Sequence, residues 1–135
     1  MGKVIFIGAR KGGVGKTMTT ASLGVGLARE GKKTLVIDAD SQYSLTVSLG
    51  VEEPNKLPVT LTTIMKNIIH EKNFNPTDGI IHHIEGVDLL PANESLTSVE
   101  LALAPLIGRE TILRQYIKML ETVYDFILIR LSSES

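Results

Sequence analysis

A glycine-rich segment near the start of the chain has the residue types and spacing of a phosphate-binding loop. Its glycines allow a tight turn in which several backbone N–H groups point at one anion. The Lys16 ammonium can reach the outer phosphates of a nucleotide, and the Thr17 hydroxyl can coordinate a magnesium ion. We therefore predict a site for a nucleotide polyphosphate and magnesium. Its predicted binding residues are Lys11, Gly12, Gly13, Val14, Gly15, Lys16, Thr17 and Met18.

This loop needs a strand before it and a helix after it, and the sequence predicts both. The run 4–7 is continuously apolar, which indicates a buried strand. Residues 17–30 place Ala21 and Val25 at helical spacing, and Gly31 is expected to end the helix. The N-terminus of such a helix adds the positive end of its dipole to the anion site.

Two carboxylates follow the next apolar run. Asp38 and Asp40 leave the carboxyl end of a strand predicted over 32–38, and ligands bind at this end of open α/β sheets. Carboxylates in this position can hold magnesium through water or orient the water that attacks a terminal phosphate. The residues alone leave a second interpretation open, in which both are solvated loop acids.

The rest of the chain alternates apolar strands with amphipathic helices. Such alternation predicts an α/β fold with a mainly parallel sheet flanked by helices, because parallel strands need crossover connections. Helices are predicted over 44–49, 61–69, 94–104 and 109–122, and strands over 86–91 and 126–129.

Composition narrows the class of protein. The chain has 135 residues, a net charge of −1 and no cysteine, which fits one domain without disulfides, thiolate metal sites or a strong basic face. The run 4–7 is too short for a signal peptide or a membrane span, so we expect a cytoplasmic protein. Adjacent His82 and His83 would point to opposite faces of a strand, and we expect them to be surface or structural residues rather than metal ligands.

Several motifs resemble the ParA/MinD family of ATPases and, within it, the ParA/Soj-type partition ATPases. The loop follows the pattern Lys-Gly-Gly-x-Gly-Lys-Thr, which is the deviant Walker A motif of that family. Residues 38–42 are similar to the family's switch I segment, although Ser41 stands where proline is common. Segments 86–93 and 124–129 also match, so the resemblance spans residues 3–129.

The resemblance implies a P-loop NTPase fold with ATP and Mg²⁺ as cofactors. It implies that Lys11 touches the nucleotide of a dimer partner, that Lys16 binds phosphates and that Asp40 positions the hydrolytic water. Thr17 and Asp38 would support the magnesium ion. It further implies a nucleotide-dependent homodimer that partitions plasmids or chromosomes, with a ParB-like stimulator and non-specific DNA as partners whose surfaces lie largely outside residues 1–135. We expect no membrane contact, because the apolar stripe over 61–69 lacks a basic polar face.

The pattern fails at Arg130, where the family's Walker B strand carries the aspartate that supports the metal. A cation there opposes a divalent metal ion, so we expect very slow or absent hydrolysis. We interpret residues 1–135 as a single N-terminal portion of the ATPase domain, truncated after the Walker B strand. Two alternatives remain: a non-catalytic nucleotide-binding or dimer-interfering fragment, and a MinD-like positioning ATPase.

The last six residues, 130–135, are interpreted as a non-native tail. One coding of Arg-Leu-Ser-Ser-Glu-Ser, with a single base removed, reads Asp-Cys-Pro-Pro-Ser-Leu, which is similar to the family's string. A one-base insertion at codon 130 would therefore explain both the arginine and the ending. Reading the coding DNA tests this hypothesis.

Overall fold

A five-stranded sheet with the strand order β1-β5-β2-β4-β3 forms the centre of the computed structural model, which describes residues 2–7, 14–103 and 108–131. Of residues 14–18 only the backbone is described. Strands β1, β5, β2 and β4 are parallel, and β3 pairs antiparallel with β4. This confirms the predicted α/β fold with a mainly parallel sheet. The strands are β1 (Lys3–Ile7), β2 (Thr34–Ala39), β3 (Ile81–His82), β4 (Asp88–Leu90) and β5 (Phe126–Leu131).

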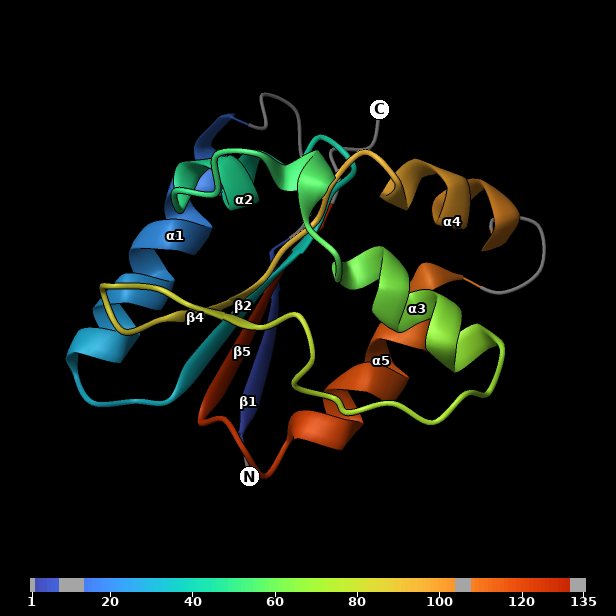
Figure 1. The fold of residues 1–135 in the computed structure, drawn as a ribbon. Helices are drawn as coiled ribbons and strands as arrows, with labels where there is room; N and C mark the ends of the chain where they lie inside the picture. Colours follow the sequence, from blue (N-terminus) through green and yellow to red (C-terminus); the bar gives the residue numbers. More distant parts are fainter. Residues whose placement is uncertain (1, 8–13, 104–107, 132–135) are drawn as a thin grey trace.

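Helices cover both faces of the sheet, with α1 and α2 on one side and α3, α4 and α5 on the other (Figure 1). Helix α1 begins at Val14, earlier than the predicted start at residue 17, and Gly31 ends it in a left-handed conformation with φ 85° as expected. The helices are α1 (Val14–Arg29), α2 (Ser44–Ser48), α3 (Leu61–Ile69), α4 (Leu96–Leu103) and α5 (Arg109–Leu120), with a 3₁₀ turn at Pro54–Lys56.

Alternate residues of the central strands belong to two hydrophobic cores, one on each face of the sheet. Leu35 and Ile127 belong to the larger core under α3, α4 and α5, whereas Val36 and Leu128 belong to the smaller core under α1 and α2. Helix α1 approaches the sheet closely at Gly24, where an added Cβ would lie 2.8 Å from Cγ1 of Val36. The glycine therefore permits close packing of α1 against the sheet at Val36.

The prediction of a buried first strand is wrong for the outer part of β1. Val4 and Ile5 are 37% and 36% exposed, whereas Phe6 and Ile7 are half-buried. The reason is the strand order, because β1 lies at the edge of the described sheet and has β5 as its neighbour there. Apolar composition predicted a strand but not its position in the sheet.

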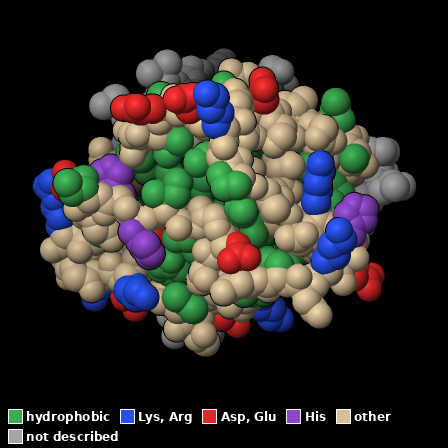
Figure 2. All heavy atoms as spheres, viewed as in Figure 1, with side chains coloured by type: hydrophobic (Ala, Val, Ile, Leu, Met, Phe, Trp, Pro, Cys, Tyr) green, Lys and Arg blue, Asp and Glu red, His purple; other side chains and the backbone are tan. Residues whose placement is uncertain are grey.

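The molecular surface carries charges of both signs. Figure 2 shows basic and acidic side chains scattered over one face, with hydrophobic side chains exposed between them. Across the described ranges, no helix is both long and apolar enough to cross a membrane.

Candidate functional site

The residues predicted to bind a nucleotide lie after β1 and at the start of α1, and the structure describes them only in part. Lys11, Gly12 and Gly13 fall outside the described residues. Residues 14–18 form the first turn of α1, with their backbone described and their side chains not. Helix α1 begins at the edge of the sheet where β2 ends (Figure 1). The roles predicted for Lys11, Lys16 and Thr17 therefore stay predictions.

Asp38 is a buried acid at the carboxyl end of β2, with no exposed surface. Its Oδ2 accepts hydrogen bonds from the Thr46 backbone N–H at 2.9 Å and from the Thr46 hydroxyl at 2.7 Å. The Thr46 hydroxyl in turn accepts from the N–H of Ala92 at 2.9 Å. Asp38 thus connects β2 with α2 and, through Thr46, with the segment that follows β4.

Asp40 is also buried, at 3% exposure, which excludes the interpretation of solvated loop acids. Its Oδ1 accepts a hydrogen bond from the Gln42 N–H at 3.0 Å, and its backbone carbonyl accepts one from the Tyr43 N–H at 2.8 Å. Tyr43 adopts a left-handed conformation with φ 46°, which non-glycine residues rarely adopt. Such backbone strain is concentrated at functional sites.

Arg130 completes this cluster from the central strand β5. It is 4% exposed, and its guanidinium donates a hydrogen bond to Oδ2 of Asp40 within a buried ion pair. The Arg130 Nε is buried and finds no acceptor in the part of the chain that the structure describes. In the sheet, Arg130 lies between Ile7 of β1 and Asp38 of β2. The arginine is therefore at the point where the predicted phosphate loop leaves β1.

Burial has the largest effect on the pKa of Asp38. Loss of hydration raises the pKa of Asp38 from 3.8 to about 6, and the negative charge of Asp40 acts in the same direction. The hydrogen bonds from Thr46 and the positive charge of Arg130 oppose this rise. The pKa therefore reflects a carboxyl group that is well hydrogen-bonded and yet removed from water.

The two acids do not fit a divalent cation in this arrangement. Asp38 already accepts hydrogen bonds from Thr46, Asp40 is paired with Arg130, and a second cation would be repelled by the guanidinium. Within residues 2–7, 14–103 and 108–131 there is no group of three His, Cys, Asp or Glu side chains placed to hold a metal ion. The metal role of Asp38 gains no support from these contacts and, like that of Thr17, stays a prediction.

Sequence reasoning identified Asp38 and Asp40 but missed Thr46 and the contact of Arg130 with Asp40. The side chains of β5 alternate between the two faces of the sheet, and this alternation indicates where Arg130 lies. Arg130 is two residues after Leu128, which packs under α1 and α2. Arg130 therefore belongs to the same face as α1. Thr46 carries no comparable signal, because its contact depends on how α2 is placed.

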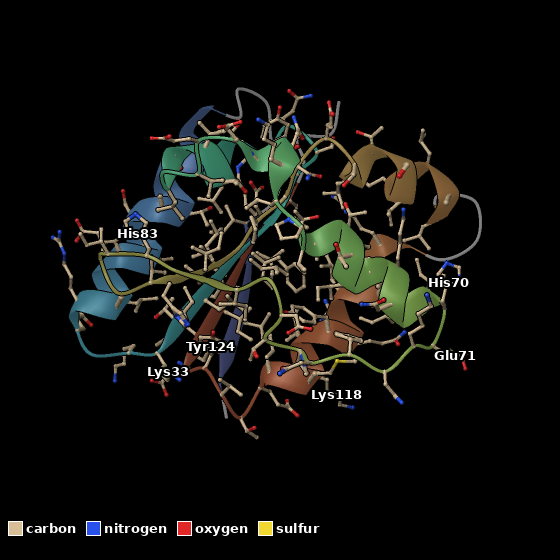
Figure 3. All side chains as sticks on the ribbon, in the orientation of Figure 1. Lys33, His70, Glu71, His83, Lys118 and Tyr124 are labelled. Atoms are coloured by element: carbon tan, nitrogen blue, oxygen red, sulfur yellow. The ribbon has the colours of Figure 1, made fainter. Side chains whose placement is uncertain are left out.

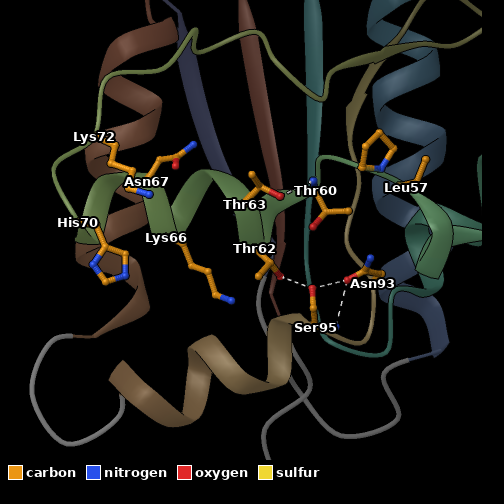
Figure 4. Close-up of a pocket in the computed structure, with 11 residues that line it drawn as sticks. Leu57, Thr60, Thr62, Thr63, Lys66, Asn67, His70, Lys72, Asn93 and Ser95 are labelled. Atoms are coloured by element: carbon orange, nitrogen blue, oxygen red, sulfur yellow. Dashed lines mark hydrogen bonds between the residues drawn. The ribbon is translucent and has the colours of Figure 1, made fainter.

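A separate pocket of about 580 Å³ is lined mainly by α3 and the segments before α3 and α4 (Figure 4). Thr60 and Thr63 form a capping box at the start of α3, and the Ser95 hydroxyl donates to the Thr62 hydroxyl at 2.8 Å. These polar groups are thereby engaged with one another. The lining residues are Leu57, Pro58, Thr60, Thr62, Thr63, Lys66, Asn67, His70, Lys72, Asn93 and Ser95.

A family model described as an AAA domain matches residues 2–133 of this chain. Among curated relatives, the sporulation initiation inhibitor protein Soj of Bacillus subtilis is 34% identical over 133 residues, which are 96% of this chain and 49% of the relative. The chromosome-partitioning ATPase Soj of Thermus thermophilus is 34% identical over 93% of this chain and 44% of its own length. The chain thus spans about half the length of these relatives.

Solved structures give the same picture. A cobyrinic acid a,c-diamide synthase from Mycobacterium smegmatis with bound ADP and magnesium superimposes with a TM-score of 0.85 at 35% identity, covering 98% of this chain and 51% of that one. A complex of a McdA variant from Cyanothece with ATP gives a TM-score of 0.83 at 28% identity, covering 99% of this chain and 49% of that one. The fold described above is therefore one that binds adenine nucleotides in these proteins.

Proposed function

The chain belongs to the AAA domain family and is a homologue of ParA/Soj-type ATPases, and from this premise we propose that it binds ATP at the carboxyl ends of β1, β5 and β2. The observation that carries the proposal is the cluster of buried charges Asp38, Asp40 and Arg130 at this edge of the sheet. Proteins do not bury such groups without strong partners, and open α/β sheets bind ligands at this edge.

The predicted loop residues supply the phosphate contacts in this proposal. Lys16 binds the outer phosphates, the backbone of 11–18 surrounds them, and Lys11 reaches the nucleotide of a second copy in a homodimer. The start of α1 at Val14 supports this assignment, because its free N–H groups and dipole favour an anion there. When bound with the nucleotide, Mg²⁺ would neutralise phosphate charge, and Thr17 is the residue proposed to reach it.

Hydrolysis is proposed to be very slow or absent in this chain. Asp40 is the group proposed to orient the attacking water, and its carboxylate oxygens already accept from Gln42 and Arg130. An acid held in a buried ion pair is a poor acceptor for a water proton. This contact favours the second candidate function, a non-catalytic nucleotide-binding fragment that would interfere with dimers of an intact homologue.

The wider role is proposed from the relatives. Soj of Thermus thermophilus is a chromosome-partitioning ATPase, and we propose that the protein to which this chain corresponds acts in the cytoplasm in partitioning of a chromosome or plasmid. Its partners would be a second copy, a ParB-like stimulator and non-specific DNA. The tail 130–135 is proposed to be non-native, so the contacts of Arg130 describe this chain and not an intact homologue. Sequencing the coding DNA tests this proposal, which fails if no single-base deletion restores a family-like frame.

Titration of ATP with Mg²⁺ into the whole chain and into Lys16→Ala tests the binding site. Loss of a charge-assisted contact to phosphate should weaken binding by about tenfold or more. Lys118→Ala provides a matched control, because Lys118 is an exposed residue of α5 on the opposite side of the sheet. Equal affinities of the whole chain and Lys16→Ala would contradict the assignment, as would an equal loss in both variants.

Phosphate release from ATP measures the second part of the proposal. The whole chain should release phosphate no faster than Lys16→Ala does, because both lack a working acceptor for the attacking water. Substantial release that depends on Lys16 would show that the ion pair opens during turnover.

A further inference from the structure

The side chain of Arg130 lies on the face of the sheet that α1 covers. In β5, Leu128 packs in the core under α1 and α2, and residues two apart in a strand point to the same face. Asp38 of β2 follows the same rule relative to Val36, and its bonds to Thr46 of α2 agree with it. The charged cluster therefore shares one side of the sheet with the N-terminus of α1.

The position of Arg130 along β5 places it at the end of the sheet where α1 begins. Gly24 of α1 sits over Val36 and Leu128. From this point α1 extends back about 15 Å to Val14, at 1.5 Å per residue. The strand rises roughly 7 Å from Leu128 to Arg130, and the arginine side chain continues beyond the strand to Asp40. The guanidinium thus lies at the same end of the sheet as the beginning of α1, where the phosphates are proposed to bind.

The guanidinium is not saturated by its carboxylate partner. One Nη donates to Asp40, and the buried Nε lacks an acceptor in the described part of the chain. A planar guanidinium carries five N–H donors and matches the oxygens of a phosphate particularly well. A buried donor without an acceptor is unfavourable, so an anion placed here would gain a partner that is already fixed in position.

We propose that Arg130 is an internal counter-cation of the nucleotide site: its guanidinium donates to phosphate oxygens, and the chain binds nucleotide polyphosphates without needing a divalent cation. This inference rests on the proposed nucleotide site. It follows from the contacts described above, in which Asp40 is already paired with the Arg130 guanidinium. The positive charge that a metal ion would bring is supplied by the chain itself.

ATP titrations in Mg²⁺ and in EDTA, on the whole chain and on Arg130→Gln, test the inference. The whole chain should bind ATP with similar affinity in both buffers. Arg130→Gln should bind about tenfold more weakly in EDTA, because a charge-assisted contact is lost. Arg29→Gln is the matched control, since it removes an exposed arginine that pairs with Glu85 at 2.8 Å far from the site.

A second variant keeps the test decisive if Arg130→Gln does not fold. Asp40→Asn retains the arginine but weakens its competing partner, so ATP affinity in EDTA should rise. An EDTA-induced loss of affinity in the whole chain, or unchanged affinity in Asp40→Asn, would overturn the inference. If binding still depends on Lys16, the proposed function survives that result. If the whole chain binds ATP neither in Mg²⁺ nor in EDTA, both the inference and the proposed function are overturned.

Discussion

Two buried aspartates of neighbouring parallel strands lie at opposite strand ends. We call the side of the sheet where the parallel strands begin the amino edge and the side where they end the carboxyl edge. Asp38 is near the carboxyl end of β2, and Asp88 is the first residue of β4. Asp88 accepts a hydrogen bond from the Tyr124 hydroxyl at 2.7 Å and contacts Nδ1 of His82 at 2.6 Å. Burial, followed by the bond to Asp88, raises the pKa of Tyr124, which keeps its phenol protonated as a donor.

The two clusters differ in what they leave unsatisfied. At the amino edge, Asp88 is paired with the Tyr124 hydroxyl. The Tyr124 ring centre also lies 5.5 Å from Nζ of Lys33, and Figure 3 shows Lys33 beside Tyr124. At the carboxyl edge, Arg130 retains a buried N–H without an acceptor in the described residues. We infer that the amino-edge cluster stabilises the fold, whereas the carboxyl-edge cluster has capacity left for a ligand.

Breaking the carboxyl-edge pair should have the largest effect on stability. Arg130→Ala leaves a buried carboxylate at Asp40, which should lower the free energy of unfolding by about 3–5 kcal/mol. Urea unfolding measures this change. Arg29→Ala removes an exposed ion pair and should lower it by less than about 1 kcal/mol. Equal effects of the two variants would show that the Arg130 pair is not buried in solution.

The raised pKa of Asp38 makes stability depend on pH. Its pKa of about 6 in the folded chain exceeds the ordinary 3.8, so between these values the folded chain binds more protons than the unfolded chain. The free energy of unfolding should therefore fall as pH rises from about 4 to 6, by on the order of 3 kcal/mol from this group, and then level off.

Unfolding of the whole chain and of Asp38→Asn across this pH range measures the difference. The variant should lose most of the slope, because Asn does not titrate. A slope of the same size in Asp38→Asn would assign the effect to other groups. In Arg130→Gln the fall should extend to higher pH, since the arginine lowers the pKa of Asp38.

A smaller effect is expected at the amino edge. Tyr124→Phe removes one donor to the buried Asp88 and should lower the free energy of unfolding by about 1–3 kcal/mol. ATP affinity should not change, because this edge is proposed to be structural. A loss of ATP affinity in a folded Tyr124→Phe variant would contradict the distinction between the two edges.

Local patterns in the sequence predicted much of this molecule. Apolar periodicity located the long elements, as at 61–69, because helices and strands have fixed periods. It could not reveal that β1 is an edge strand with Ile5 exposed, since strand order depends on distant pairings. It also placed the start of α1 too late, because Gly15 disfavours helix in isolation while the surrounding fold does not.

The candidate site likewise has a part that the sequence predicted and a part that it could not. The position of Asp38 and Asp40 at a strand end follows from the apolar run before them. The contact of Arg130 with Asp40 joins residues 90 positions apart, and the bond from Thr46 depends on the placement of α2. Such contacts are fixed by tertiary packing; the alternation of β5 indicates the face on which Arg130 lies but not its partner.

Hydrogen exchange of the whole chain with and without ATP shows where the nucleotide binds, because it reports on both ends of the parallel strands in one experiment. We expect ATP to slow exchange in peptides covering 14–20 and 38–46 and to leave exchange in peptides covering 82–88 and 121–126 unchanged. Slower exchange at 82–88 and 121–126 without any change at 14–20 and 38–46 would contradict a nucleotide site at the carboxyl ends of the strands.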